Sequence, residues 1–344
     1  MRGYRRRGTA SYLVGVAVSF LLVIQLGGTL LQLPDKPHWG LVIQGTDQVV
    51  RRVMPDSPAA RAGIRVGDEV QSFAGVAWAR SWDRTYESDG SAVARVRTPG
   101  GIPREVRIER AVSPPHEIVR RLVQGLVGLA FVLIGLVVFL SRSDRVSTLF
   151  FLMCLLLSRM VLPDPEHSGR GTFLFDKATL DLATLFLAPV VLHFFLNFPI
   201  RTRIASRHPR AVTLLYLPSV VAAAVVLKFD VDLITGPDRM PPSAIALQLV
   251  TAIVSVVMIV TGVGLFLRGV RKASSPVLRR SLRWVLPGTA LGILPPLVMT
   301  VILNGNPTLT IPGDRYIFVT FLLVPLTFAH AILRYGLLDL ELVV

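Results

Sequence analysis

Residues 118–140 read IVRRLVQGLVGLAFVLIGLVVFL, a mainly apolar stretch of 23 residues. A helix that crosses a lipid bilayer needs about 20 mostly apolar residues, so this stretch predicts a membrane-spanning helix. The whole chain has the same character, because 52% of its 344 residues are hydrophobic and its mean hydropathy is +0.58. This composition is too apolar for an ordinary water-soluble globule.

Further segments of this kind lie on both sides of the first. Eight in all meet the length and composition of a span: 12–33, 118–140, 146–162, 177–199, 211–229, 243–267, 284–303 and 315–333. The segment 146–162 is the shortest. We therefore expect an α-helical membrane bundle, with a transmembrane anchor at 12–33 and a seven-span bundle at 118–333.

The basic N-terminus, residues 1–11, resembles the start of a secretion signal, because four arginines precede the first apolar run. That run is longer than the 7 to 15 or so residues of a signal core, and no A-x-A cleavage pattern follows it. We therefore expect an uncleaved anchor.

The net charge of +15 is concentrated in particular loops. The segments 1–11, 141–145, 200–210 and 268–283 hold 16 Lys or Arg against the single acid Asp144. The loops 163–176, 230–242 and 304–314 instead carry seven acids against Arg170 and Arg239. The positive-inside rule then predicts that both termini are cytoplasmic and that residues 37–113 are extracytoplasmic. Basic residues on short loops beside spans do not form a nucleic-acid surface, so we expect no nucleic-acid partner.

A segment of soluble character, residues 37–113, interrupts the apolar spans. It contains 11 basic and 9 acidic residues. The alternating runs QVVRRV and AVARVR predict strands. Ser57 as N-cap, Pro58 at the first helical position and Gly63 at the end predict a short helix. We expect a small α+β domain without a disulfide, because Cys154 is the only cysteine and lies inside a span.

Residues 49–75, VVRRVMPDSPAARAGIRVGDEVQSFAG, resemble the V-x-P-x-S-P-A-x-x-A-G-hydrophobic-x-x-G-D stretch of bacterial PDZ domains. In that family a glycine-containing loop binds a peptide C-terminus, and the peptide adds as a strand to the sheet edge. The resemblance implies a peptide-binding site at Trp39, Gly40, Leu41, Val42 and Ile43. Between Trp82 and Gly90 there are too few residues for the long second helix of the family. A PDZ scaffold used for packing or dimerisation without a ligand therefore remains an alternative.

A PDZ domain attached to membrane spans also resembles the arrangement of intramembrane metalloproteases of the site-two class. Their chemistry needs two histidines four residues apart with a glutamate as base. His116-Glu117 is not followed by the second histidine, and neither a G-x-S-x-G motif nor a pair of aspartates deep in two spans occurs. We expect no catalytic residues, no metal and no cofactor in this chain.

Polar and small residues within the spans give further expectations. His193 and Asn197, spaced i, i+4, predict an intramembrane polar site, as either a structural hydrogen bond or a proton-sensitive switch. Arg159 lies near the outer end of a short span, where we expect it to snorkel to the interface. Gly288 and Gly292 form a G-x-x-x-G pattern that predicts a close helix contact. Helix kinks are expected at Pro189, Pro218, Pro287, Pro295, Pro296 and Pro325.

A second resemblance concerns the bundle and the end of the chain. Residues 189–199, PVVLHFFLNFP, are similar to the L-H-x-x-L-x-F-P segment of multi-span sensor regions in bacterial histidine kinases, and residues 329–344 are similar to the run with which such regions leave the membrane. The resemblance implies a cytoplasmic exit segment at 334–344. It also implies a kinase-type output, whose phosphoacceptor and nucleotide-binding parts are absent from this chain.

Together these observations predict a sensory input module in a bacterial inner membrane. Its PDZ-like domain would detect a peptide or protein tail outside, and the bundle would relay a shift to a cytoplasmic kinase-type output. The expected partners are the lipid bilayer, a peptide C-terminus, that output, and a second copy in a homodimer. The alternative is a noncatalytic scaffold that recruits substrates to a separate membrane protease or transporter. A transporter itself is disfavoured, because the spans lack a deep charged pathway.

Overall fold

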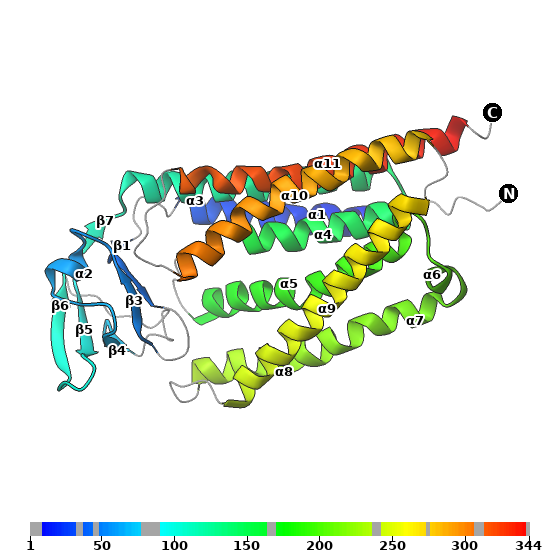
Figure 1. The fold of residues 1–344 in the computed structure, drawn as a ribbon. Helices are drawn as coiled ribbons and strands as arrows, with labels where there is room; N and C mark the ends of the chain where they lie inside the picture. Colours follow the sequence, from blue (N-terminus) through cyan, green and yellow to red (C-terminus); the bar gives the residue numbers. More distant parts are fainter. Residues whose placement is uncertain are drawn as a thin grey trace.

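The computed structural model describes residues 9–31, 37–43, 48–76, 90–163, 170–235, 242–272, 276–305 and 313–341. In this described part, long helices form a bundle and a small β domain lies at one end of it (Figure 1). Helix α1 begins, and helix α11 ends, at the opposite end of the bundle (Figure 1). We use "β domain" for the described residues between 37 and 113.

The long helices are α1 (Thr9–Leu31), α3 (Pro115–Ser141), α4 (Arg145–Val161), α5 (Arg170–Asn197), α8 (Leu217–Thr235), α9 (Pro242–Lys272), α10 (Pro276–Gly305) and α11 (Leu323–Glu341). Shorter elements connect some of them: α6 (Arg203–Arg207), α7 (Pro209–Thr213) and the 3-10 helices η3 (Leu214–Tyr216) and η4 (Asp314–Leu322). Successive long helices run in alternating directions along the bundle (Figure 1).

Seven helical segments of the described chain are long and apolar enough to cross a membrane: Tyr12–Leu31, Pro115–Ser141, Gly171–Asn197, Pro209–Asp232, Ala246–Lys272, Leu282–Ile302 and Tyr316–Arg334. The predicted count of eight spans is therefore not confirmed. The remaining segment is α4, which has only 17 residues. It packs between α3 and α5, and many of its side chains are buried by these neighbours. The chain is thus a multi-pass membrane protein by the length and composition of its helices.

Aromatic side chains dominate the bundle core in the half away from the β domain. The ring of Phe194 on α5 lies 5.6 Å from that of Phe328 on α11, and Phe195 lies 5.2 Å from Phe266 on α9. The ring of Phe328 also contacts that of Phe266 at 5.9 Å. Because aromatic pairs at these separations add to the burial of their area, this cluster ties α11 to α5 and α9.

The predicted close contact at Gly288 and Gly292 is confirmed. A Cβ at Gly288 would lie 2.3 Å from Thr327 Cγ2, and one at Gly292 would lie 2.8 Å from Val324 Cγ2. Both neighbours belong to α11, so the pattern joins α10 to α11 within one chain.

The prolines divide into two groups. Pro189 lies inside α5, and Pro287, Pro295 and Pro296 lie inside α10. Pro218 and Pro325 instead occupy the first turns of α8 and α11. The 3-10 helices η3 and η4 lead directly into these two turns, and the kinks expected at Pro218 and Pro325 stay a prediction.

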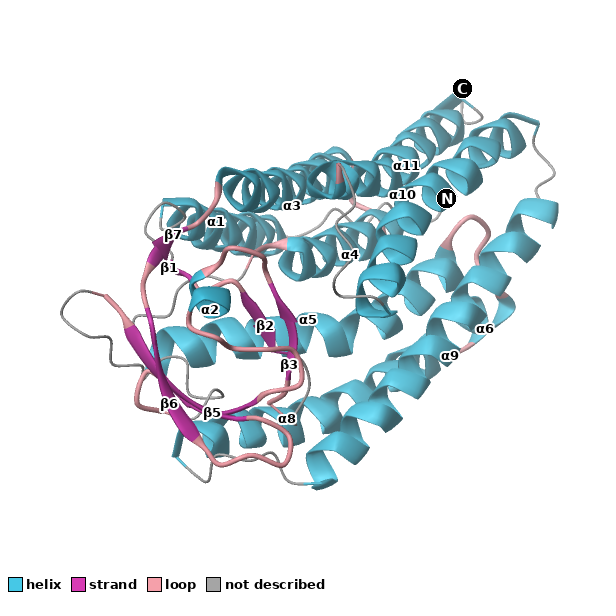
Figure 2. Cartoon of the chain, turned by 60° about the vertical axis from the view of Figure 1, so that its left-hand side comes forward, coloured by secondary structure: helices cyan, strands magenta, loops and turns pink. Residues whose placement is uncertain are grey.

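The β domain consists of β1 (Pro37–His38), β2 (Leu41–Ile43), β3 (Val50–Val53), α2 (Pro58–Arg61), β4 (Glu69–Phe73), β5 (Ala92–Arg97), β6 (Arg104–Ile108) and β7 (Ala111–Val112). Antiparallel pairing joins β4–β5–β6, β2–β3 and β1–β7 (Figure 2). The inward residues of β3 to β6, including Val50, Val70, Phe73 and Ile108, form a core without exposed surface.

The local predictions for this domain are confirmed where the structure describes it. Strands form at 50–53 and 92–97. Ser57 caps α2, because its Oγ accepts the N–H of Ala60 at 3.2 Å, and Gly63 follows the helix with φ +76°. The expected lack of a long second helix between Trp82 and Gly90 falls outside the described residues.

Candidate peptide-binding edge and its connection to the membrane helices

Gly40 shapes the turn that leads into β2. Its φ is +72°, and a Cβ there would lie 2.0 Å from the Cβ of Ser57, so only glycine fits. Its carbonyl accepts the N–H of Met54 at 2.7 Å and the hydroxyl of Ser57 at 3.3 Å. The carbonyl of Trp39 accepts the N–H of Ala59 at 3.0 Å. The turn before β2 is therefore fixed against the capped end of α2.

The backbone of β2 leaves one edge open. The carbonyl of Gly40 points toward the β3 side, where it accepts a hydrogen bond from Met54. Leu41 lies opposite Val53 of β3. Backbone polar groups alternate between the two edges of an antiparallel strand, so the N–H and C=O of Leu41 point away from β3. Within the described residues, no strand pairs with that outer edge. An extended peptide could add there by strand pairing.

The predicted site residues take different positions around this edge. Leu41 and Ile43 are partly buried and pack against the core of the β domain, whereas the alternation of a strand turns Val42 to the other face. The indole of Trp39 is buried and meets the ring of Phe73 edge-on at 5.2 Å. Leu41 and Ile43 thus flank the open edge while packing on the core, and the Trp39 side chain stabilises the core.

Strands β1 and β7 join the two connections between the β domain and the helices. Pro37 pairs with Val112 and His38 with Ala111. Strand β1 follows α1 and leads directly into Trp39 and Gly40, and β7 precedes α3. The turn at Gly40 is therefore two residues from a ribbon that holds the ends of both chain connections together.

Helices α1 and α3, which carry this ribbon, pack closely. A Cβ at Gly125 would lie 2.9 Å from Leu26 Cδ1, and one at Gly15 would lie 2.8 Å from Phe139 Cε1. The rings of Tyr12 and Phe139 meet at 5.7 Å. Contacts at both ends of α1 make α1 and α3 a single packed pair.

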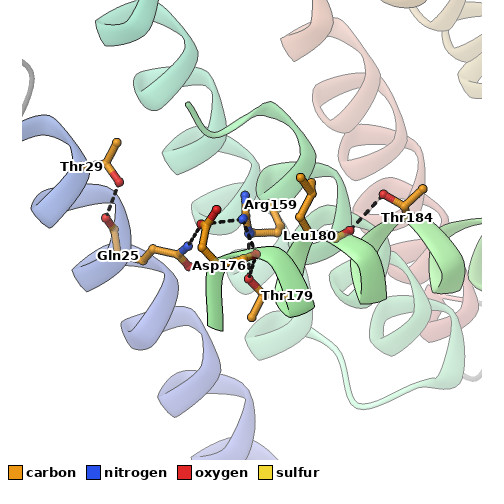
Figure 3. Close-up of polar contacts among 7 residues, drawn as sticks. All are labelled: Gln25, Thr29, Arg159, Asp176, Thr179, Leu180 and Thr184. Atoms are coloured by element: carbon orange, nitrogen blue, oxygen red, sulfur yellow. Dashed lines mark hydrogen bonds and ion pairs between the residues drawn. The ribbon is translucent and has the colours of Figure 1, made fainter. Parts of the chain in front are cut away.

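A buried polar cluster connects α1 to α4 and α5 (Figure 3). Arg159 Nη2 donates to Asp176 Oδ1 at 2.6 Å and to the carbonyl of Asp176 at 2.7 Å, and its Nε donates to Thr179 Oγ1 at 3.0 Å. Gln25 Nε2 of α1 donates to the same Asp176 Oδ1 at 2.9 Å. Arg159 is 3% exposed, so the expectation that it snorkels to the interface is wrong. A paired carboxylate inside the protein holds it there instead.

Ionisable residues also surround the ribbon itself. Glu117, in the first turn of α3, accepts hydrogen bonds from Arg120 and Arg121. Burial lowers the pKa of His38 on β1, with His116 and Arg121 acting in the same direction and Glu117 opposing them. The folded β domain therefore disfavours the protonated form of His38.

His193 and Asn197 both lie on α5 but make separate interactions. His193 Nδ1 is 3.0 Å from the Tyr216 hydroxyl of η3, and Asn197 Nδ2 donates to the His193 carbonyl at 2.8 Å. Of these two residues, only His193 forms the expected hydrogen bond to another helical element. The two side chains are not joined, and a role as a proton-sensitive switch stays a prediction.

Residues 49–85 match the family model of the PDZ domain. A comparison with curated proteins and one with solved structures gave no match. The β domain thus contains a PDZ domain at residues 49–85, which include the capped α2, and this class typically binds peptide C-termini by strand addition. The chain is a membrane protein that carries a PDZ module.

Proposed function

We propose that this protein is a membrane sensor whose PDZ domain detects the C-terminus of a peptide or protein and whose helices relay binding across the membrane. One observation carries the proposal: the turn at Gly40 lies two residues from the β1–β7 ribbon that holds the ends of α1 and α3. A peptide added at the β2 edge would bias the position of this ribbon. Ligand binding shifts a two-state equilibrium only through such differential contacts.

The contacts within the bundle support a route from the ribbon to α11. Gln25 connects α1 to Asp176, which Arg159 also binds, so α1, α4 and α5 share one polar cluster. Further along α5, Phe194 packs on Phe328 of α11. A shift of α1 would change the hydrogen bond between Gln25 and Asp176. Helix α5 would transmit this change to the contact between Phe194 and Phe328.

The position of the basic loops at the ends of the helices supports an orientation with the PDZ domain outside. The basic segments 200–210 and 268–283 flank helix ends opposite the β domain (Figure 1). The positive-inside rule makes that end cytoplasmic. We place the protein in a bacterial inner membrane and assign it no catalytic step. The shift at α11 would reach a cytoplasmic kinase-type output, in the manner of the sensor regions that residues 189–199 resemble.

The test uses the full chain in lipid nanodiscs with spin labels at Arg210→Cys and Arg334→Cys. Both positions are exposed, and the native Cys154 is buried. A library of peptides with free C-terminal carboxylates is screened for binding, and the distance between the labels is measured with and without the best peptide. We expect saturable binding and a changed distance, and neither with the amidated peptide. Chains that carry only one label give a distance only when two copies associate, so they report a homodimer in the same experiment.

A matched pair of variants assigns the effect to the β2 edge. Leu41→Asp places a negative charge beside the open edge of β2 and should abolish binding of a peptide with a free carboxylate. Val66→Asp adds the same charge at an exposed turn and should leave it unchanged. Binding without a change in distance would favour the scaffold function, and absence of binding to the folded chain would refute the peptide receptor.

A further inference from the structure

A strongly basic turn connects α5 to the next span. This "basic elbow" comprises residues 201–214 and includes α6 and α7, which lie at the end of the bundle away from the β domain (Figure 1). It contains four arginines, Arg201, Arg203, Arg207 and Arg210, and no acidic residue. All four are exposed. The elbow therefore presents a concentrated positive charge.

The elbow has a defined structure. Thr202 caps α6 by accepting the N–H of Ala205 at 3.3 Å, and its own hydroxyl donates to the carbonyl of Leu196 at 3.1 Å. Ala205 and Val212 are buried against Leu192 and Leu196 of α5. These contacts hold the backbone, so the arginines project from a fixed surface.

The outward arginines lack acidic partners in the structure. None of Arg203, Arg207 and Arg210 forms an ion pair with any residue that the structure describes. Two large apolar side chains stand beside them, Ile204 with 59% and Leu214 with 65% of their surface exposed. A surface that combines unpaired arginines with exposed aliphatic side chains is typical of the membrane interface.

We propose that the basic elbow binds the phosphate headgroups of anionic phospholipids in the bilayer around it. It joins the spans Gly171–Asn197 and Pro209–Asp232 and includes the first residues of the second span, so it sits where headgroups are. Guanidinium groups bind phosphate oxygens in a bidentate manner, and Ile204 and Leu214 can enter the acyl boundary. A soluble acidic partner would meet the same arginines but would leave these two side chains facing lipid or water without a role.

The test measures lipid retention by native mass spectrometry of the full chain in micelles that contain equal amounts of phosphatidylglycerol and phosphatidylcholine. The variant carries Arg203→Gln, Arg207→Gln and Arg210→Gln. We expect the wild-type protein to prefer phosphatidylglycerol and the variant to lose roughly tenfold or more of that preference, because each basic residue near an anionic surface contributes to attraction. Equal unfolding temperatures in phosphatidylcholine establish that the variant is folded.

Two control variants remove the same charge elsewhere. Arg61→Gln, Arg65→Gln and Arg95→Gln lie on the β domain and should not change the preference. Arg268→Gln, Arg271→Gln and Lys272→Gln lie at the end of α9, and a loss as large as that of the elbow variant would assign the preference to general charge and overturn the proposal. An unchanged preference in the elbow variant would also overturn it, in favour of a soluble acidic partner. Complete displacement of phosphatidylglycerol by millimolar inorganic phosphate would overturn the lipid as the source of the headgroup.

Discussion

Arg159 and Asp176 form an ion pair inside the helix bundle, with 2.6 Å between Nη2 and Oδ1 and neither residue more than 5% exposed. Removing one partner leaves the other as an uncompensated buried charge, which typically costs about 3–5 kcal/mol. We expect Arg159→Met to lower the free energy of unfolding by about this amount. Thermal unfolding in detergent measures the change.

The double variant Arg159→Met/Asp176→Leu is the control for this prediction. It removes both charges, so we expect it to be more stable than the single variant. Gln25 would then lose its acceptor on Asp176, which limits the recovery. A single variant as stable as the wild-type protein would contradict the buried pair.

Gly40→Ala tests the turn before β2. The new Cβ would lie 2.0 Å from the Cβ of Ser57, and φ is +72°, so the turn must move. We expect the β domain to lose more stability than in Gly75→Ala, where φ is +80° but no atom lies within 4 Å of the new Cβ. Gly75→Ala should lower the stability only through backbone strain, which costs about 1–2 kcal/mol. Limited proteolysis of the β domain in the full chain compares them, and equal losses would show that contact with Ser57 is unimportant.

The sequence was sufficient for features that depend on local pattern. Apolar length located the helices, and the Ser57 cap and the Gly288 contact followed from residue type and spacing. The pair of Arg159 and Asp176 could not be predicted in the same way, because the pattern of α4 and α5 does not say which faces meet. An arginine and an aspartate near the same predicted membrane surface were the available signal.

The candidate site was predicted only in part for a similar reason. The resemblance of residues 49–75 located the segment around Gly40, but the β1–β7 ribbon contains two residues in each strand, too few for an alternation of apolar and polar residues to appear. Strand pairing between residues 37 and 112 is a long-range property of the fold. The connection of the PDZ domain to α1 and α3 is therefore visible only in three dimensions.

His38 should make the stability of the β domain depend on pH. Burial lowers its pKa below the ordinary value of 6.5, so the folded state disfavours the protonated ring. As the pH falls through 6.5, the unfolded state takes up a proton that the folded state does not, and the free energy of unfolding decreases. Above that pH the contribution of His38 is constant.

Proteolysis rates of the full chain at about pH 7.5 and about pH 5.5, on either side of the ordinary histidine pKa, measure this effect. We expect faster cleavage of the β domain at the lower pH, and a smaller difference in His38→Gln. His116 lies nearby and is mutated separately, since it acts on His38 in the same direction as burial. An equal pH dependence in wild type and His38→Gln would exclude His38 as its source.

The contact between α10 and α11 gives the last prediction. Gly288→Ala would place a Cβ 2.3 Å from Thr327 Cγ2, so α11 must move away from α10 or Thr327 must rotate. Gly264 of α9 has no atom within 4 Å of a new Cβ, and Gly264→Ala should be neutral or stabilising because alanine favours a helix by up to about 1 kcal/mol. We expect Gly288→Ala to lower the unfolding temperature while Gly264→Ala does not. The same variant should alter the distance between labels at residues 210 and 334, because α11 carries the second label. If Gly288→Ala left both quantities unchanged, the close approach at Gly288 would not hold α11 in place, and the route from the PDZ domain to the end of the chain would depend on other contacts of α11, such as the aromatic contacts with α5 and α9.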